Sequence, residues 1–275
     1  MTRRVIEPVV LNAREPAGAS RPLGELGAEL RTRINRIIGA HADPATGYLD
    51  YRAIGETAEF RGFVGLTGGL ATGRPEELPT AEAQIAFWAN LYNALTLHAI
   101  VTLDIQNGVG DVHEFFRRVQ YDVGGDRLSL LDIEHGVLRR NRPSRNQPAR
   151  VFGRGDRRLR WVVTRFDPRV HFALNCGARS CPPVRAYDPR QLDGQLDLAT
   201  RGFVNADVEI DPAARCLTLS RIFYWYEDDF GDVPGFLLAH LDPGPARDWL
   251  AAHRGAVTLV HRAYDWDLND ASVRA

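Results

Sequence analysis

The stretch AEAQIAFWANLYNALTLHAIV, residues 81–101, carries the clearest helical pattern of the chain. Apolar side chains recur there every three or four residues and predict one buried stripe of an α-helix, formed by Ile85, Trp88, Tyr92, Leu95 and Ala99. Thr80 stands directly before the pattern, where a hydroxyl can cap the free backbone N–H groups of a first helical turn. We therefore predict that this helix packs into the core and that the other elements are arranged around it.

Two amide side chains interrupt this apolar helix. Asn90 and Asn93 lie three residues apart, on a face beside the apolar stripe. An unpaired buried amide is costly, so one interpretation is that both side chains hydrogen-bond a nearby loop. The other is that they orient a catalytic histidine or hold a substrate carbonyl. We treat them as candidate substrate-binding residues and leave both interpretations open.

The segments around this helix indicate the fold class. A first amphipathic helix is predicted from Leu23 to about residue 41, after a loosely ordered tail over residues 1–22. Residues 118–123 alternate as a strand and are followed by a Gly-Gly turn. Further strands are predicted at residues 159–164, 170–175, 216–220 and 257–261, and further helices after Ser129, Ser220, Asp232 and Gly244. We expect an α+β fold over residues 23–275, a helix-rich single domain around a small, mainly antiparallel sheet.

Composition excludes several functions. The chain has 275 residues, of which 44% are hydrophobic, so it is able to bury a sizeable core. All of its basic residues are arginines, which excludes a Schiff-base lysine and the lysine of a phosphate-binding loop. The net charge of -1 and a basic segment without interleaved aromatics give no strong nucleic-acid signal. No signal-peptide pattern or long apolar run is present, so we expect a cytoplasmic protein with no membrane association.

The cysteines direct attention to one short segment. Cys176, Cys181 and Cys216 are an odd and sparse set, which fits free thiols or a metal site better than a disulfide framework, although the first two are close enough in sequence to form a disulfide. Gly177 removes a side chain beside Cys176, so backbone amides could approach a developing oxyanion there. Arg179 would favour a thiolate and is a third candidate substrate-binding residue. The same C-x4-C spacing suits a metal-binding turn.

A second candidate segment is LSLLDIEHGVL, residues 128–138. If it is a helix capped by Ser129, Glu134 lies within its apolar arc and His135 at the edge of that arc. A carboxylate in such a position needs a partner. It either forms a structural ion pair with an arginine or tunes a nearby histidine for acid–base chemistry.

Five blocks of the sequence together resemble a known family. FWANLYNALTLH, SLLDIEHGVLR, FDPRVHFALNCGARSCPPVRAY, SRIFYWYEDDFG and YDWDLND, between about residues 85 and 270, are similar to the family catalogued as domain of unknown function 547. The resemblance implies an α+β domain with a cysteine-hydrolase-like activity. It also implies a role for Glu134, His135, His171 and Cys176.

These residues support hypotheses of different classes. In the first, the chain is a hydrolase or acyltransferase that acts on a small-molecule or peptide substrate without a cofactor. Cys176 is then the nucleophile, His135 is its base, and Glu134 is a candidate orienting group. His171 and Cys176 would project to opposite faces of a regular strand, which disfavours a direct pair. In the second, zinc is bound by His135, His171, Cys176 and Cys181. In the third, the chain is a non-catalytic binding scaffold.

Overall fold

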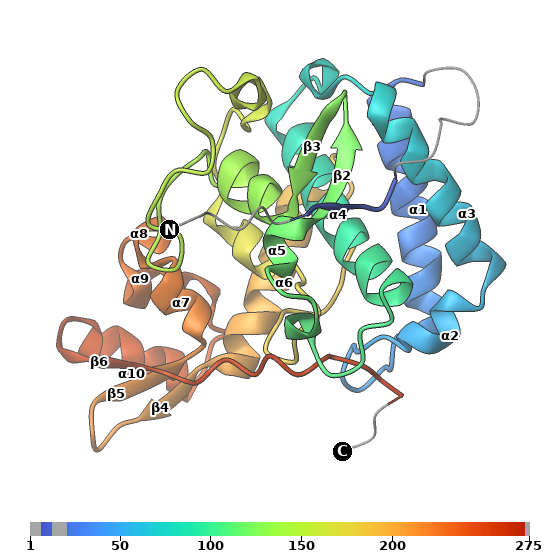
Figure 1. The fold of residues 1–275 in the computed structure, drawn as a ribbon. Coiled ribbons are helices and arrows are strands. Elements are labelled where there is room, and N and C mark those ends of the chain that lie inside the picture. The colour runs from blue at the N-terminus through green and yellow to red at the C-terminus, as the bar shows by residue number, and fades with distance from the viewer. Residues whose placement is uncertain (1–6, 13–20, 273–275) are drawn as a thin grey trace, which may run out of the picture.

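Helix α4 (Ala81–Thr102) forms the centre of the protein in the computed structural model, which describes residues 7–12 and 21–272 (Figure 1). Thr80 caps the helix as predicted, because its hydroxyl accepts a hydrogen bond from the N–H of Ala83 at 3.1 Å. The helix is buried almost all round and not along one stripe, since it packs against α1 (Leu23–His41), α2 (Tyr51–Gly55), β2 (Val119–Val123) and α6 (Leu192–Asp207).

The helices before α4 cover one of its sides. Helix α1 has the predicted boundaries and buries Leu26, Leu30 and Ile34 along one face. Helix α3 (Ala58–Thr67) packs against α1 and begins at Thr57, whose hydroxyl accepts from the N–H of Phe60. Short turns then lead to α4 and away from it, namely η1 (Gly68–Thr72), η2 (Pro75–Glu77), η3 (Val109–Asp111) and α5 (Phe115–Arg118).

The first sheet has the strand order β1-β2-β3. Strand β2 pairs antiparallel with β3 (Asp126–Ser129) through the predicted turn, in which Gly124 and Gly125 both have positive φ, at +59° and +78°. Strand β1 (Val9–Val10) pairs parallel with β2, with Val9 opposite Val119. Part of the expected loose tail is therefore ordered as an edge strand, and residues 1–6 and 13–20 of that tail lie outside the described residues.

The second sheet and a group of short helices form the C-terminal part. Strands β4 (Glu209–Asp211) and β5 (Cys216–Leu219) are antiparallel, whereas β6 (Thr258–His261) is parallel to β5. The accompanying helices are α7 (Arg221–Trp225), α8 (Glu227–Phe230), α9 (Val233–His240), α10 (Pro245–His253) and η7 (Arg254–Ala256). The helix-rich α+β class is confirmed. The predicted single, mainly antiparallel sheet is instead two small mixed sheets, each with one parallel pair.

The prediction of strands at residues 159–164 and 170–175 was wrong. These segments form the 3₁₀ helices η5 (Arg157–Trp161) and η6 (Pro168–Phe172) followed by irregular chain. Pro168 occupies the first turn of η6, and the Asp167 carboxylate accepts from the N–H of Arg169 at 3.0 Å. A short apolar run fits a strand or a buried helical turn equally well. The argument that separated His171 from Cys176 therefore no longer applies.

Within residues 7–12 and 21–272, no helix combines enough length with enough apolar character to cross a membrane.

Candidate active site

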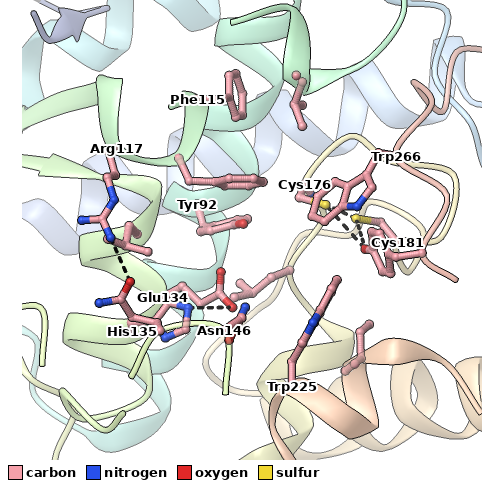
Figure 2. Close-up of a pocket in the computed structure, with 18 of the residues that line it drawn as sticks. Tyr92, Phe115, Arg117, Glu134, His135, Asn146, Cys176, Cys181, Trp225 and Trp266 are labelled. Atoms are coloured by element: carbon pink, nitrogen blue, oxygen red, sulfur yellow. Dashed lines mark hydrogen bonds and ion pairs between the residues drawn. The ribbon is translucent and has the colours of Figure 1, made fainter. Parts of the chain in front are cut away.

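A cavity of about 540 Å³ lies between α4, the segment that follows η6, and the C-terminal part of the chain. The four residues predicted to be catalytic, Cys176, His135, Glu134 and His171, all contribute to its wall. Figure 2 shows Cys176 and Cys181 on one side of the cavity and Glu134 and His135 on the other. Its aromatic walls include Phe115, Trp225, Tyr264 and Trp266.

The cysteine side of the cavity is shaped by Gly177. This residue has φ +85°, and a Cβ added to it would lie 2.6 Å from Cδ1 of Ile100 on α4. Its N–H donates to Oδ1 of Asn175 at 2.8 Å, while the Nδ2 of Asn175 donates to the carbonyl of Pro182 at 2.7 Å. The turn is thereby closed against α4, and the backbone on both sides of Gly177 faces the Cys181 sulfur.

The Cys181 sulfur is surrounded by hydrogen-bond donors. The backbone N–H of Cys176 lies 3.0 Å from Sγ, and the hydroxyl of Tyr264 lies 3.1 Å from it. Burial raises the pKa of the Cys181 thiol, but hydrogen bonds from the Cys176 thiol, the Tyr264 hydroxyl and the backbone N–H groups of Cys176 and Ala178 outweigh burial and lower it. Within this pair of thiols, the hydrogen bonds therefore favour the charged form of Cys181.

The pKa of Cys176 shifts in the opposite direction. Its pKa is raised well above the ordinary value, because its thiol donates to Cys181 and because it is buried. Its sulfur lies 3.6 Å from the Tyr264 hydroxyl, farther than that of Cys181. Both sulfurs are free thiols. The backbone amides that we expected to serve an oxyanion beside Cys176 instead stabilise the neighbouring thiolate.

The three predicted substrate-binding residues lie elsewhere. The side chain of Asn90 exchanges hydrogen bonds with the backbone of Tyr187, and Asn93 donates to the carbonyl of Ala173 and accepts from the N–H of Asn175. Neither lines the cavity, so their contacts match the loop-anchoring interpretation. Arg179 is also absent from this wall and pairs with Asp267 at 3.5 Å.

The opposite side is built by η4 (Asp132–Leu138), a π-helix. Such wide turns are rare and concentrate at functional sites. Here Glu134 and His135, although consecutive, both reach the cavity, with Oε1 of Glu134 3.9 Å from Nε2 of His135. The hydroxyl of Tyr226 donates to Oε1 of Glu134. The structure thus brings the predicted Glu and His together.

His135 is held in one protonation state. Arg139 has only donors, and its Nη1 lies 2.8 Å from Nδ1 of His135, so that nitrogen accepts and the proton of the neutral ring is on Nε2. Burial lowers the pKa of His135 to about 4, and the charge of Arg139 acts in the same direction. At neutral pH the ring is therefore uncharged, with its N–H on the nitrogen that lies nearer Glu134.

His171 belongs to a different pair, which sequence reasoning missed. Its Nε2 lies 2.9 Å from Oδ2 of Asp229, and the Nε of Arg139 donates to the same oxygen at 2.6 Å. Burial raises the pKa of Asp229, but these two hydrogen bonds outweigh it and lower the pKa. Burial also lowers the pKa of His171, whose ring stacks on Tyr226 with centroids 4.0 Å apart. Asp229 lies in the block EDDF, whose acidic residues gave a signal that we did not use.

Three tyrosines were also missed as site residues. Tyr264 and Tyr226 supply the hydroxyls described above. Tyr92, which the sequence pattern placed in the apolar stripe, lies between the cysteine side and Glu134 with its hydroxyl toward the cavity (Figure 2). Burial raises its pKa well above the ordinary value, and Glu134 and both cavity cysteines add to this effect, which indicates that Tyr92 is near all of them.

The geometry of a zinc site is not formed. Within residues 7–12 and 21–272, no three His, Cys, Asp or Glu side chains are grouped as ligands of one ion would be. His171 faces Asp229 and His135 faces Arg139, so the imidazole nitrogens engaged by these groups are unavailable to a metal shared with the cysteines. The alternative ligand set His135, His171, Cys176 and Cys181 thus loses its geometric support.

The fold and the cavity define an α+β protein in which a hydrogen-bonded pair of thiols faces a carboxylate and a neutral imidazole. The model of the family described as "Protein of unknown function, DUF547" matches residues 75–204, so this segment of the chain carries the domain of that family. The matched segment includes Tyr92, Glu134, His171 and both cavity cysteines. The last two blocks of the resemblance, around residues 220–231 and 264–270, lie outside it. Neither the curated proteins nor the solved structures contain a match to this chain.

Proposed function

We propose that this protein is a cysteine-dependent hydrolase or acyltransferase that forms a thioester with an amide- or ester-type substrate, and that Cys181 is its nucleophile. The observation that carries the proposal is the set of donors at the Cys181 sulfur, on the wall of the cavity. These donors favour the thiolate, which is the reactive form of a cysteine. We move the nucleophile from Cys176 to Cys181 because the Cys176 thiol is a donor to its neighbour and resists ionisation.

The reaction would proceed in two steps. Attack of the Cys181 thiolate on the substrate carbonyl forms a C–S bond, and collapse of the resulting oxyanion breaks the bond to the leaving group. That group takes a proton, and the acyl thioester remains. Water or another acceptor then attacks the thioester, gives up a proton, and restores the thiolate. In the proposed reaction Glu134, across the cavity from the cysteines, takes the proton that Cys181 loses and hands it to the leaving group in the first step. It then receives the proton of the attacking water or other acceptor in the second step.

The oxyanion must be stabilised by hydrogen-bond donors that are already in position before the reaction. The Tyr92 hydroxyl and the Nε2–H of His135 both face the cavity and are fixed by burial. A neutral imidazole whose proton is held on one nitrogen can act as such a donor. His135 thus keeps a role in the proposal, but as a donor and not as the base that we expected.

The side chains that line the cavity indicate the chemical character of the substrate near the reacting bond. Trp225, Tyr264 and Trp266 pack against one another on the cavity wall with tilted rings, whose centroids are 4.6 to 5.8 Å apart. Such a wall fits an apolar or planar group of a small molecule or peptide. We place the reaction in the cytoplasm, where free thiols persist.

The first test combines alkylation and acylation of the native protein. Iodoacetamide labelling of each cysteine, followed by mass spectrometry from pH 5 to 10, should find Cys181 reacting at lower pH than Cys176. p-Nitrophenyl acetate should then leave an acetyl group on Cys181. A Cys181→Ser variant should lose this adduct, whereas Cys216→Ser should retain it. If Cys181 reacts with both reagents no faster than it does in the urea-unfolded chain, the nucleophile assignment is refuted.

The adjacent second sulfur favours one other candidate, dithiol–disulfide exchange. In this reaction the Cys181 thiolate would attack a substrate disulfide, and Cys176 would resolve the mixed disulfide. Two thiols would be oxidised while one disulfide is reduced. Incubation with oxidised glutathione distinguishes the candidates, because exchange predicts a 176–181 disulfide and a stoichiometric release of reduced glutathione, whereas acyl transfer predicts neither.

A further inference from the structure

A second cavity, of about 400 Å³, lies on the other side of Cys181. Cys181, Pro182 and Tyr264 line both cavities, so the sulfur forms part of the partition between them. The first cavity has mainly aromatic walls near the cysteines. The second is bordered by arginines, namely Arg179, Arg185, Arg221 and Arg262.

The charges of these arginines are compensated unequally. Arg262 is fully engaged, with Asp207 at 2.7 Å and Glu209 at 3.0 Å. Arg179 has a longer contact with the exposed Asp267. Among the residues that the structure describes, Arg185 and Arg221 form no ion pair, and the Arg221 guanidinium only lies over the Tyr224 ring at 5.2 Å. The second cavity therefore carries an excess of positive charge.

We infer that this second cavity binds a small oxyanion, a carboxylate or a phosphate, that is part of the substrate whose carbonyl reacts at Cys181. The inference rests on the proposed function for the identity of the reacting group. Arginine guanidinium groups recognise both kinds of oxyanion through paired N–H donors. The hydroxyls of Ser180 and Ser220 on the same wall accept hydrogen bonds from the N–H groups of Asp265 and Ile222, and their own O–H groups are further donors. A substrate that is apolar at one end and anionic at the other would place its reactive carbonyl at the shared wall.

The inference can be tested before any substrate is known. Iodoacetate and iodoacetamide alkylate a thiolate by the same displacement of iodide and differ in that iodoacetate is an anion. The ratio of their rate constants at Cys181 therefore measures the charge around the sulfur. We expect the ratio in the native protein to exceed that of the urea-unfolded chain by roughly three- to tenfold, and to fall in 1 M NaCl, where charges are screened within about 3 Å.

Substitutions test whether the higher ratio of the two rate constants is caused by the arginines of the second cavity. Arg185→Gln combined with Arg221→Gln should return the ratio to that of the unfolded chain, while the iodoacetamide rate changes less than twofold. Arg52→Gln combined with Arg154→Gln removes the same charge from exposed positions outside both cavities and should leave the ratio unchanged. Protection of Cys181 by inorganic phosphate, compared with protection by acetate, indicates which oxyanion is preferred.

The outcomes separate the two proposals. A native ratio equal to that of the unfolded chain, with iodoacetamide still fast, overturns the oxyanion site and leaves the nucleophile in place. Slow reaction with both reagents refutes the nucleophile. Calorimetric titration with phosphate then tests the oxyanion site independently of the nucleophile. Binding that is lost in the Arg185→Gln/Arg221→Gln variant supports the site, and absence of binding to the native protein overturns it.

Discussion

At the scale of single residues, the site is governed by which hydrogen-bond partner each titratable group has. Cys176 and Cys181 are five positions apart in one loop, yet their pKa values move in opposite directions because one thiol donates to the other. His135 was the natural base by residue type, but the N–H of Arg139 occupies its acceptor nitrogen. Partners of this kind decide roles that residue identity leaves open.

Replacing Tyr264 by Phe tests the donor at the thiolate. Loss of the hydroxyl removes a hydrogen bond to the charged form of Cys181, so its pKa should rise and iodoacetamide labelling at pH 7 should slow by roughly threefold to tenfold. At pH 10 the variant and the native protein should react alike. Tyr224→Phe removes an exposed tyrosine hydroxyl outside the cavity and serves as the control. Equal rates for Tyr264→Phe and native protein at pH 7 would contradict the assignment.

The tautomer of His135 is a second prediction at this scale. Nitrogen-detected NMR of labelled protein should show the proton on Nε2 at pH 7, and an imidazole that stays neutral until about pH 4. Because the pKa is lowered on folding, the unfolded chain binds the proton first as the pH falls below about 6.5. The free energy of unfolding should then decrease between about pH 6.5 and pH 4, by up to about 3 kcal/mol.

Urea titrations at pH 7 and pH 5 measure this loss, and a His135→Gln variant should show a smaller one. An Nδ1 proton on His135, or an imidazole that titrates near pH 6.5, would disprove the proposed donor role and reopen that of a base.

At the scale of secondary-structure elements, two unusual turns build the two sides of the cavity. The π-helix η4 directs both Glu134 and His135 to it, where a regular α-helix would separate neighbours by about 100°. The turn at Gly177 brings the backbone N–H groups on its two sides to one sulfur. Local backbone geometry, and not side-chain identity alone, therefore creates both halves of the site.

Gly177→Ala should damage the fold and the site together. A Cβ there meets Ile100, and a non-glycine residue at φ +85° is strained, so we expect a loss of about 2–4 kcal/mol in the free energy of unfolding. The displaced amides should also raise the pKa of Cys181 and shift its labelling curve to higher pH. Gly194→Ala in α6, where a Cβ meets open space, should be neutral or stabilising. A Gly177→Ala variant as stable as the native protein would show that the turn tolerates a side chain.

At the scale of the whole molecule, the C-terminal segment joins distant parts of the chain. After β6 it runs along the lower edge of the molecule in Figure 1 toward α2. The N–H of Asn269 donates to the carbonyl of Gly177 at 2.9 Å, and its side-chain oxygen accepts from the buried Tyr51 hydroxyl at 2.6 Å. The segment that supplies Tyr264 is thereby fixed to the cysteine turn and to the N-terminal helices.

A double-mutant cycle between Tyr51→Phe and Asn269→Ala measures this connection. Each single change should reduce the free energy of unfolding, and the coupling energy should be about 1–2 kcal/mol, because the bond joins two buried groups. Urea denaturation provides the values, and Tyr48→Phe combined with Asn269→Ala serves as an uncoupled reference pair. A coupling energy near zero would mean that the C-terminal segment is held by other contacts.

The sequence by itself determined the elements whose pattern is local and the segments that carry the chemistry. Helix periodicity and capping residues gave α1, α4 and the helix after Ser220, and the resemblance selected the segments of Glu134, His171 and Cys176. Only the tertiary structure decided that the Cys181 sulfur receives hydrogen bonds from Cys176 and Tyr264, that Arg139 engages Nδ1 of His135, and that Asp229 pairs with His171. These outcomes depend on contacts between residues far apart in the chain, and on burial, which changes the free energy of every charged form that it encloses.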